Sequence, residues 1–389
     1  MAEVLLPPRD LLVKRVGIGA LFAHNGAVIG FWASRIPQIS ERHGLSEAHL
    51  GLLLLLIALG AILSFGFAGR ASDRFGAAGL SMLLACLGTA FLIGIALAPN
   101  VAVLAVALAG LGASLGGMDV SMNAWAAQVD ARSRREAMPV FHALWSLGAG
   151  LAAATGAVTL SLEWSALAHF AILGVLSLGV ALALAGVAGG LSVQHRSVQT
   201  QQSERFALPP KALVWLGAMA ALAALGEGAM IDWSALFLVE AIDAPQDEAA
   251  LGLTVFSVAM VATRLSGPLL LERLGAQPAA IGSGFVAAFG VALALMSTNL
   301  TGALLGFVAM GMGYALIFPL AMSQAAKYPD LPPGRAIAAA ATLGYSGILV
   351  GPVLIGFLAH ATSLQGAFGL LISLALLTSV LAWRARFEP

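Results

Sequence analysis

Long apolar stretches alternate with short polar breaks along the whole chain. Each stretch is about 20 residues long, which is the length that a helix needs to cross the hydrocarbon of a bilayer. The stretches are continuous and show no period of two, so the pattern excludes a β-barrel. We therefore predict an all-α polytopic membrane protein with twelve transmembrane helices. The predicted spans are 15–37, 48–69, 78–98, 101–125, 138–160, 166–190, 211–239, 250–271, 278–297, 301–324, 336–359 and 364–385.

The charges in the polar breaks predict the orientation of these spans. With a cytoplasmic N-terminus, all 19 Lys and Arg residues except Arg35 and Arg42 belong to breaks on the cytoplasmic side, Arg264 among them. Basic residues in short loops resist translocation. Because no Ala-x-Ala cleavage pattern follows Met1, we expect the first span to be retained. The prediction is a multi-pass protein of a bacterial inner membrane with both termini in the cytoplasm.

The composition agrees with lipid as the solvent of this chain. Hydrophobic residues make up 60% and charged residues 10% of the 389 residues, whereas a soluble domain has about 25% charged residues. The formal net charge is zero, so nothing indicates a nucleic-acid partner. The single cysteine, Cys86, excludes a disulfide framework and a cysteine-ligated metal. The expected partners are the bilayer, protons and a small solute, with no metal and no cofactor.

The chain reads as a duplicated unit. The longest polar stretch, 191–210, predicts a cytoplasmic linker between an N-terminal six-helix bundle (1–190) and a C-terminal one (211–389). Short motifs recur about 200 residues apart. The matches are Trp32 with Trp233, Gly51 with Gly252 and Gly110-Leu111-Gly112 with Gly311-Met312-Gly313, all 201 apart, and Asp73–Gly76 with Glu272–Gly275, 199 apart. Parallel repeats are a transporter architecture that places the substrate site at the repeat interface.

The break after the second span carries a motif that can be named. Gly69-Arg70-Ala71-Ser72-Asp73-Arg74-Phe75-Gly76 resembles the signature cytoplasmic loop of the major facilitator superfamily, although Ala77 and Ala78 replace the usual basic residues after it. The stretches WASRIP (32–37), MDVSMN (118–123), FHALWSLGAG (141–150) and EGAMIDWSALFL (227–238) are similar to its bacterial fucose-permease-like branch, whose substrates are poorly assigned. The resemblance covers the whole chain. It implies a monomeric secondary transporter of two pseudo-symmetric bundles that works by alternating access.

The resemblance also implies gates. Asp73 is expected to face the N-terminus of the helix that begins near Ala336, an interaction of about 0.3–1 kcal/mol. At the outer side, Arg35 either pairs with Asp232 or only extends to the surface. The further gating candidates are Gly69, Arg70, Arg74, Gly76 and Glu136, of which the two arginines either pair with acids such as Glu136 or only anchor their segment.

Three acids lie inside predicted spans: Asp119, Glu227 and Asp232. A carboxylate at mid-membrane costs roughly 3 kcal/mol, so it generally faces a cavity or a partner. The resemblance implies that spans 1, 4, 7 and 10 line the central cavity, and all three acids are on spans 4 and 7.

Asp119, Glu227 and His142 are the candidates for proton coupling. Asn123 lies one turn after Asp119 and therefore on the same face, and His142 lies at a similar depth in the next span. A carboxylate in a medium of low dielectric takes up a proton more readily than one in water. The alternative is that Asp119 forms only a structural pair with His142 or Asn123.

Glu227 stands between Gly226 and Gly228, which predicts a bend or unwound turn in the seventh span. Asp232 is five residues later and lies on another face of a regular helix. Polar and aromatic side chains on the cavity spans suit a polar organic substrate, although each aromatic residue has helix packing as its alternative. The candidates for the substrate cavity are His24, Asn25, Trp32, Asn123, Trp145, Asp232, Tyr314, Phe318 and Gln324.

Enzyme motifs do not change this interpretation. Gly112 to Gly116 fits GxSxG but lies inside a predicted span, where small residues serve packing. No nucleotide-binding motif is present, so transport must use an ion gradient or the gradient of the substrate. We predict proton-coupled uptake of a small polar metabolite, resembling a sugar or sugar acid. The alternatives are proton-driven export of a metabolite or drug, disfavoured because the fifth span lacks the exporters' Gly-Pro motif, and an intramembrane enzyme or receptor.

Overall fold

The structure is a computed structural model that describes residues 6–133, 137–189, 211–331, 333–385 and 387. Within these residues, twelve helical segments are long and apolar enough to cross a membrane. The all-α fold with twelve spans is therefore confirmed. Several helices continue beyond the predicted spans, as in α1, which covers Pro8–His43 where the apolar pattern predicts 15–37. At such ends, polar residues continue the helix by one or more turns past the apolar stretch, so the unsatisfied backbone groups of the helix terminus lie outside that stretch.

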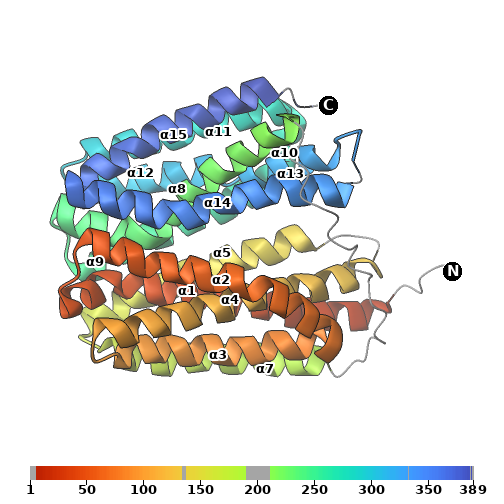
Figure 1. The fold of residues 1–389 in the computed structure, drawn as a ribbon, viewed down its shortest axis with the longest axis horizontal. Helices are drawn as coiled ribbons and strands as arrows, with labels where there is room; N and C mark the ends of the chain where they lie inside the picture. Colours follow the sequence, from red (N-terminus) through yellow and green to blue (C-terminus); the bar gives the residue numbers. More distant parts are fainter. Residues whose placement is uncertain (1–5, 134–136, 190–210, 332, 386, 388–389) are drawn as a thin grey trace. The chain divides into compact units, whose positions relative to one another are not determined.

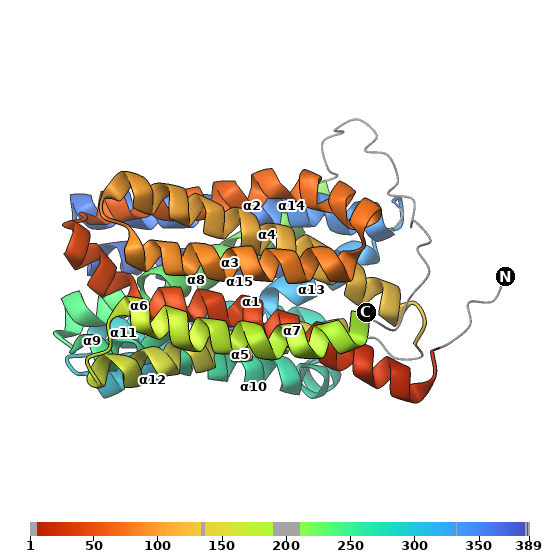
Figure 2. The same ribbon diagram turned by 90° about the horizontal axis from the view of Figure 1, so that it is seen from below.

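The helices of the first six spans are α1 to α7 (Figure 1). The sixth span is one continuous rod of three pieces, in which the π-helical turn η1 joins two α-helices. The bounds are α1 Pro8–His43, α2 Glu47–Phe75, α3 Ala77–Leu97, α4 Val101–Asp130, α5 Met138–Ser161, α6 Ala166–His169, η1 Phe170–Gly174 and α7 Val175–Gly189. Along their length, α3 and α4 lie side by side (Figure 2).

The last six spans comprise α8 to α15. The short helix α9 leads into the eighth span, and the tenth span consists of α12 and α13, which Figure 1 labels separately. The bounds are α8 Lys211–Ile242, α9 Gln246–Ala249, α10 Leu251–Leu274, α11 Ala276–Met296, α12 Leu300–Tyr314, α13 Ile317–Ala326, α14 Pro333–Ala361 and α15 Leu364–Ala385. In this half, α11 packs along α15 (Figure 1).

The chain forms two compact units. Unit 1 comprises 1–35 and 56–203, and unit 2 comprises 36–55 and 204–389. The hairpin between the first two spans thus belongs to unit 2, where Glu47 Oε2 lies 3.4 Å from His360 Nδ1. The predicted linker, 191–210, lies outside the described residues.

Both units contain the same turns and caps. Gly76 and Gly275 precede α3 and α11 with φ of 89° and 80°, a region that L side chains rarely adopt. Asn100 caps α4 by accepting a hydrogen bond from the Val103 N–H, and Asn299 caps α12 in the same way. Each second member follows the first by 199 residues.

Close helix packing shows the register of the repeat. A Cβ on Gly112 would overlap the carbonyl oxygen of Ile57, and a Cβ on Gly311 would overlap that of Phe256. Gly311 follows Gly112 by 199 residues, and Phe256 follows Ile57 by the same number. The predicted match of Gly110-Leu111-Gly112 with Gly311-Met312-Gly313 at 201 residues was therefore wrong by two positions. Glycine-rich apolar sequence matches itself in several registers, whereas the backbone contact between two helices is made in one.

Candidate functional site

A polar cluster in unit 1 joins three helices. Asn25 on α1 donates from Nδ2 to the carbonyl of Leu115 on α4, at 3.2 Å. Its Oδ1 accepts a hydrogen bond from Nε1 of Trp145 on α5, at 2.8 Å. Asn25 is buried and Trp145 is half-buried. The amide is thus held in one orientation, with its donor and its acceptor each assigned a partner.

Asp119 lies one turn after Leu115 on α4. Asn123 Nδ2 donates to Asp119 Oδ1 at 3.0 Å and to the Asp119 carbonyl at 2.8 Å, so the predicted pair of Asp119 and Asn123 is present. Both side chains are half-buried. His142 is exposed on α5, where its ring lies edge-on to Phe22 with centroids 5.4 Å apart. Its predicted part in proton coupling stays a prediction.

His24 and Trp32 lie elsewhere in unit 1. His24 is buried between α1, α3 and α7, with Nδ1 2.9 Å from Ser177 Oγ and Nε2 3.2 Å from Thr89 Oγ1. These bonds account for His24 as a residue that holds helices together. Trp32 is 1% exposed, and its Nε1 has no hydrogen-bond partner within the described part of the chain.

Arg35 is completely buried in unit 1. Its guanidinium donates from Nε to His169 Nδ1 at 3.2 Å, from Nη1 to the Trp164 carbonyl at 3.0 Å and from Nη2 to Thr159 Oγ1 at 2.9 Å. The alternative that Arg35 only extends to the surface is therefore wrong. The sequence argument missed His169, although a histidine inside an apolar span is the signal that would have found it. The π-helical turn begins directly after it.

A second polar cluster, in unit 2, is built around an ion pair. Arg264 Nη2 on α10 lies 3.4 Å from Glu227 Oε2 on α8, and the side chains are 16% and 22% exposed. Arg264 Nε also donates to the carbonyl of Ala315 at 3.3 Å. The assignment of Arg264 to a cytoplasmic break was wrong, because it lies within α10, Leu251–Leu274. A count that assigns every basic residue to a polar break overlooks an arginine that lies within a span and forms an ion pair with an acid on another helix.

The predicted bend at Glu227 was also wrong. Helix α8 is continuous from Lys211 to Ile242. Gly226 instead provides space, because a Cβ there would overlap the ring of Tyr314. The break occurs in the tenth span, where 315–316 interrupts the helix between α12 and α13. Arg264 thus binds the carbonyl of a residue at this break, which is how broken membrane helices satisfy freed backbone groups.

The remaining cavity candidates in unit 2 differ in their surroundings. Asp232 is half-buried on α8 and makes neither a hydrogen bond nor an ion pair to any residue that the structure describes. Phe318 packs between α13 and α14, where its ring centroid is 6.0 Å from that of Tyr345. Gln324 is 9% exposed, and Tyr314 is 2% exposed. Their predicted roles in a cavity stay predictions.

Comparison with known proteins identifies the family. The family model described as Major Facilitator Superfamily matches residues 18–333 and 218–389. The chain belongs to this superfamily. It is 37% identical to the uncharacterized transporter y4wD of Sinorhizobium fredii over 96% of this chain and 98% of that protein. It is 32% identical to an uncharacterized transporter of the same superfamily from Yersinia pestis, over 96% of this chain and 95% of that protein.

Solved structures share the fold at low sequence identity. A D-xylose–proton symporter superposes with a TM-score of 0.76 at 16% identity and covers 97% of both chains. The nucleoside transporter NupG superposes with a TM-score of 0.68 at 13% identity, over 98% of this chain and all of the other. These relatives and this fold are transporters, so the protein is a multi-pass transporter of the major facilitator superfamily.

The superfamily's signature loop is at the end of α2. Arg70, Asp73 and Arg74 are exposed, and the Arg74 guanidinium lies over the Phe75 ring, 5.2 Å from its centroid. Gly76 forms the turn into α3. Gly69 has open space where a side chain would be. Glu136, the predicted partner of the arginines, lies outside the described residues.

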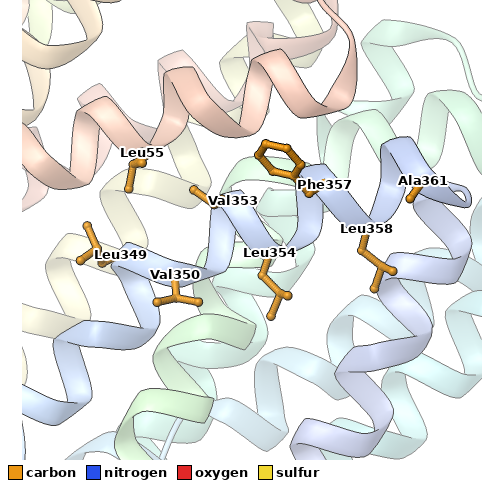
Figure 3. A pocket seen from close by; sticks show the side chains of 8 residues that line it. All are labelled: Leu55, Leu349, Val350, Val353, Leu354, Phe357, Leu358 and Ala361. Carbon is orange, nitrogen blue, oxygen red and sulfur yellow. The ribbon is translucent and has the colours of Figure 1, made fainter.

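An apolar cavity of about 640 Å³ lies in unit 2 between α2 and α14 (Figure 3). Its lining comprises Leu55, Leu349, Val350, Val353, Leu354, Phe357, Leu358 and Ala361. No polar side chain lines it, so it lacks the groups that orient a polar solute. In the described ranges, no three His, Cys, Asp or Glu side chains gather as a metal site would require.

Proposed function

We propose that this transporter takes up a small polar metabolite, a sugar or sugar acid, together with protons by alternating access. The observation that carries the proposal is the presence of carboxylates inside the spans of both units. Asp119 is held by Asn123, and Glu227 pairs with Arg264. Acids at such depth are expensive and generally serve transport of protons or solute.

Asp119 is the proposed proton carrier of unit 1. In its charged form the carboxylate accepts the hydrogen bond from Asn123. A proton on Asp119 removes the charge and weakens this bond, which changes the hydrogen-bonding groups offered to a solute. Binding of solute and of proton then influence each other by the same free energy. In this proposal, His142 on the neighbouring helix passes the proton.

Asn25 and Trp145 are the proposed solute contacts nearest to Asp119. Their mutual hydrogen bond holds the half-buried Trp145 ring in one orientation in unit 1, and we propose that this ring covers the apolar face of the solute. The solved relatives include a symporter of D-xylose and a nucleoside transporter, both named for polar solutes. Asp73 is retained as the proposed cytoplasmic latch and Arg35 as a proposed outer gating residue.

The test is proton flux into vesicles. The purified protein is reconstituted with a trapped pH dye and challenged with pools of neutral sugars, sugar acids, amino acids and nucleosides. The wild type is expected to acidify the interior with one pool, and Asp119→Asn to abolish acidification. Asn100→Asp, at an exposed helix cap outside the cluster, is the control for reconstitution.

Two results would contradict the proposal. Alkalinisation of the interior on solute entry would show exchange of solute for protons and therefore an exporter. Acidification that Asp119→Asn leaves intact would remove Asp119 from the coupling mechanism.

A further inference from the structure

We propose that the transported solute carries a carboxylate, that Arg264 binds this group, and that Glu227 releases Arg264 by accepting the cotransported proton. This inference deepens the proposed function and rests on it. It selects sugar acids over neutral sugars, and it assigns a role to an arginine that the sequence pattern had placed outside the membrane.

The first step is the weakness of the existing ion pair. The nearest nitrogen and oxygen of Arg264 and Glu227 are 3.4 Å apart, whereas a strong charge-assisted hydrogen bond measures about 2.7–2.9 Å. Both side chains retain some exposure, 16% and 22%. The ion pair is therefore partly accessible, unlike Arg35, which is completely buried. A solute carboxylate that enters from the exposed side can compete with Glu227 for the guanidinium.

The second step is the requirement for charge balance. A cation inside a span needs a counter-ion because hydrocarbon and protein do not solvate it as water does. In the solute-free protein, Glu227 provides one. A proton on Glu227 removes that negative charge, and a solute carboxylate then restores it at Arg264. The pair is neutral before and after. In this cycle Asp119 and Glu227 bind the same proton at different steps, so one proton enters with each carboxylate and no net charge moves.

The third step is the surroundings of Glu227. Within the described residues, Arg264 is the only group with which Glu227 makes a hydrogen bond or an ion pair. The described titratable and charged groups on α8 and on the helices packed against it are Asp232, Glu240, Asp247, Glu248, Arg264, Glu272, Arg273, Tyr314, Tyr345, His360 and Arg384. The charge state of Glu227 is thus coupled most directly to Arg264.

The fourth step connects the pair to the broken helix of the tenth span. Arg264 Nε donates to the Ala315 carbonyl, at the break between α12 and α13. Broken helices line the binding sites of other membrane transporters and carry the groups that bind substrate and ions. A carboxylate that draws the guanidinium towards itself would pull on this bond, so that binding is transmitted to the tenth span.

The experiment compares sugar acids with their neutral parents in vesicles containing the whole protein. Radiolabelled gluconate and glucuronate are the acid probes, and glucose is the neutral probe. The wild type is expected to take up an acid probe at least tenfold faster than glucose. An imposed membrane potential should leave the initial rate unchanged, because the proposed cycle moves no net charge.

Two single substitutions separate the two roles. Arg264→Gln should lower uptake of the acid probe at least tenfold. Glu227→Gln should abolish accumulation driven by a pH gradient while leaving exchange of labelled for unlabelled acid. Arg384→Gln and Glu248→Gln, at exposed positions in the same unit, are the matched controls and should behave as the wild type.

A charge-reversal variant separates a loss of transport from a loss of folding. The double variant Glu227→Arg with Arg264→Glu retains an ion pair, so it should elute from a sizing column as the wild type does and yet transport no acid probe. Wild-type transport by this variant would overturn the inference, because the pair would then be structural.

The remaining outcomes separate the inference from the proposed function. Proton-coupled uptake of a neutral sugar that Arg264→Gln leaves unchanged would overturn the carboxylate assignment and leave the proposed function standing. If no pool of solutes moves at all, both are overturned.

Discussion

At the scale of single residues, the charged groups inside the spans divide into two kinds. Arg35 and His24 each hold several hydrogen bonds to partners on other helices. Glu227 and Asp119 each have a single side-chain partner and keep some exposure. The second kind suits binding of a proton or solute, since a group with that role must be able to leave its partner.

The sequence predicted part of this pattern. The pair of Asp119 and Asn123 follows from helical spacing, because residues four apart share a face. The partner of Glu227 did not follow, because Arg264 is on another helix and no local rule pairs them. The same limit hid His169, which meets Arg35 across 134 residues of sequence.

The hydrogen bond between Trp145 and Asn25 can be tested by a double-mutant cycle. Asn25→Leu and Trp145→Phe should each destabilise the protein by about 1–3 kcal/mol, since each leaves a buried or half-buried polar group without its partner. The double variant should cost about 1 kcal/mol less than the two single variants combined. Thermal unfolding in detergent measures all three, and strict additivity would show that the bond contributes nothing.

At the scale of the helical elements, the sequence did not show whether a glycine bends a helix or makes room for a neighbouring side chain. The two glycines beside Glu227 predicted a bend, yet α8 is continuous. Gly226 instead leaves room for the ring of Tyr314, which a Cβ at this position would overlap. The break in the tenth span at 315–316 lies one turn before Pro319, which has no N–H to donate to the Ala315 carbonyl and whose ring crowds it. Arg264 donates to this carbonyl instead.

Gly226 and Gly228 provide a matched pair of substitutions. Gly226→Ala should destabilise the protein by about 1–3 kcal/mol, because its methyl group would overlap the Tyr314 ring and overpacking costs about this much. Gly228→Ala meets no atom within 4 Å and should leave stability unchanged or raise it. Unfolding midpoints in detergent provide the comparison. Equal behaviour of the two variants would contradict the packing described for Tyr314.

At the scale of the whole molecule, the apolar pattern was enough for the number and order of spans. The described residues contain twelve candidate spans, close to those predicted. Hydropathy succeeds because lipid forces each crossing segment to satisfy its own backbone hydrogen bonds in a helix. The repeat was predicted, and the match of Asp73–Gly76 with Glu272–Gly275 has the offset of 199 residues that the contacts of Gly112 and Gly311 show. The match of Gly110–Gly112 with Gly311–Gly313 missed this offset, because glycine-rich apolar sequence matches itself in several registers.

The predicted orientation can be tested with single cysteines. In a Cys86→Ser background, Asp330→Cys should react with a membrane-impermeant maleimide only after the cells are opened. Asp243→Cys should react in intact cells, because the distribution of basic residues predicts that these two exposed turns lie on opposite sides. Labelling of both sites in intact cells, or the reverse pattern, would contradict cytoplasmic termini.

The central claim is that solute uptake is driven by protons. The most direct measurement is accumulation of the identified solute in vesicles under an imposed inward proton gradient. With one proton per solute in an electroneutral cycle, a gradient of one pH unit is expected to drive about tenfold accumulation, which an uncoupler should collapse. Asp119→Asn should allow no more than equilibration. Wild-type uptake that stops at equal concentrations, whatever the pH gradient, would contradict the account.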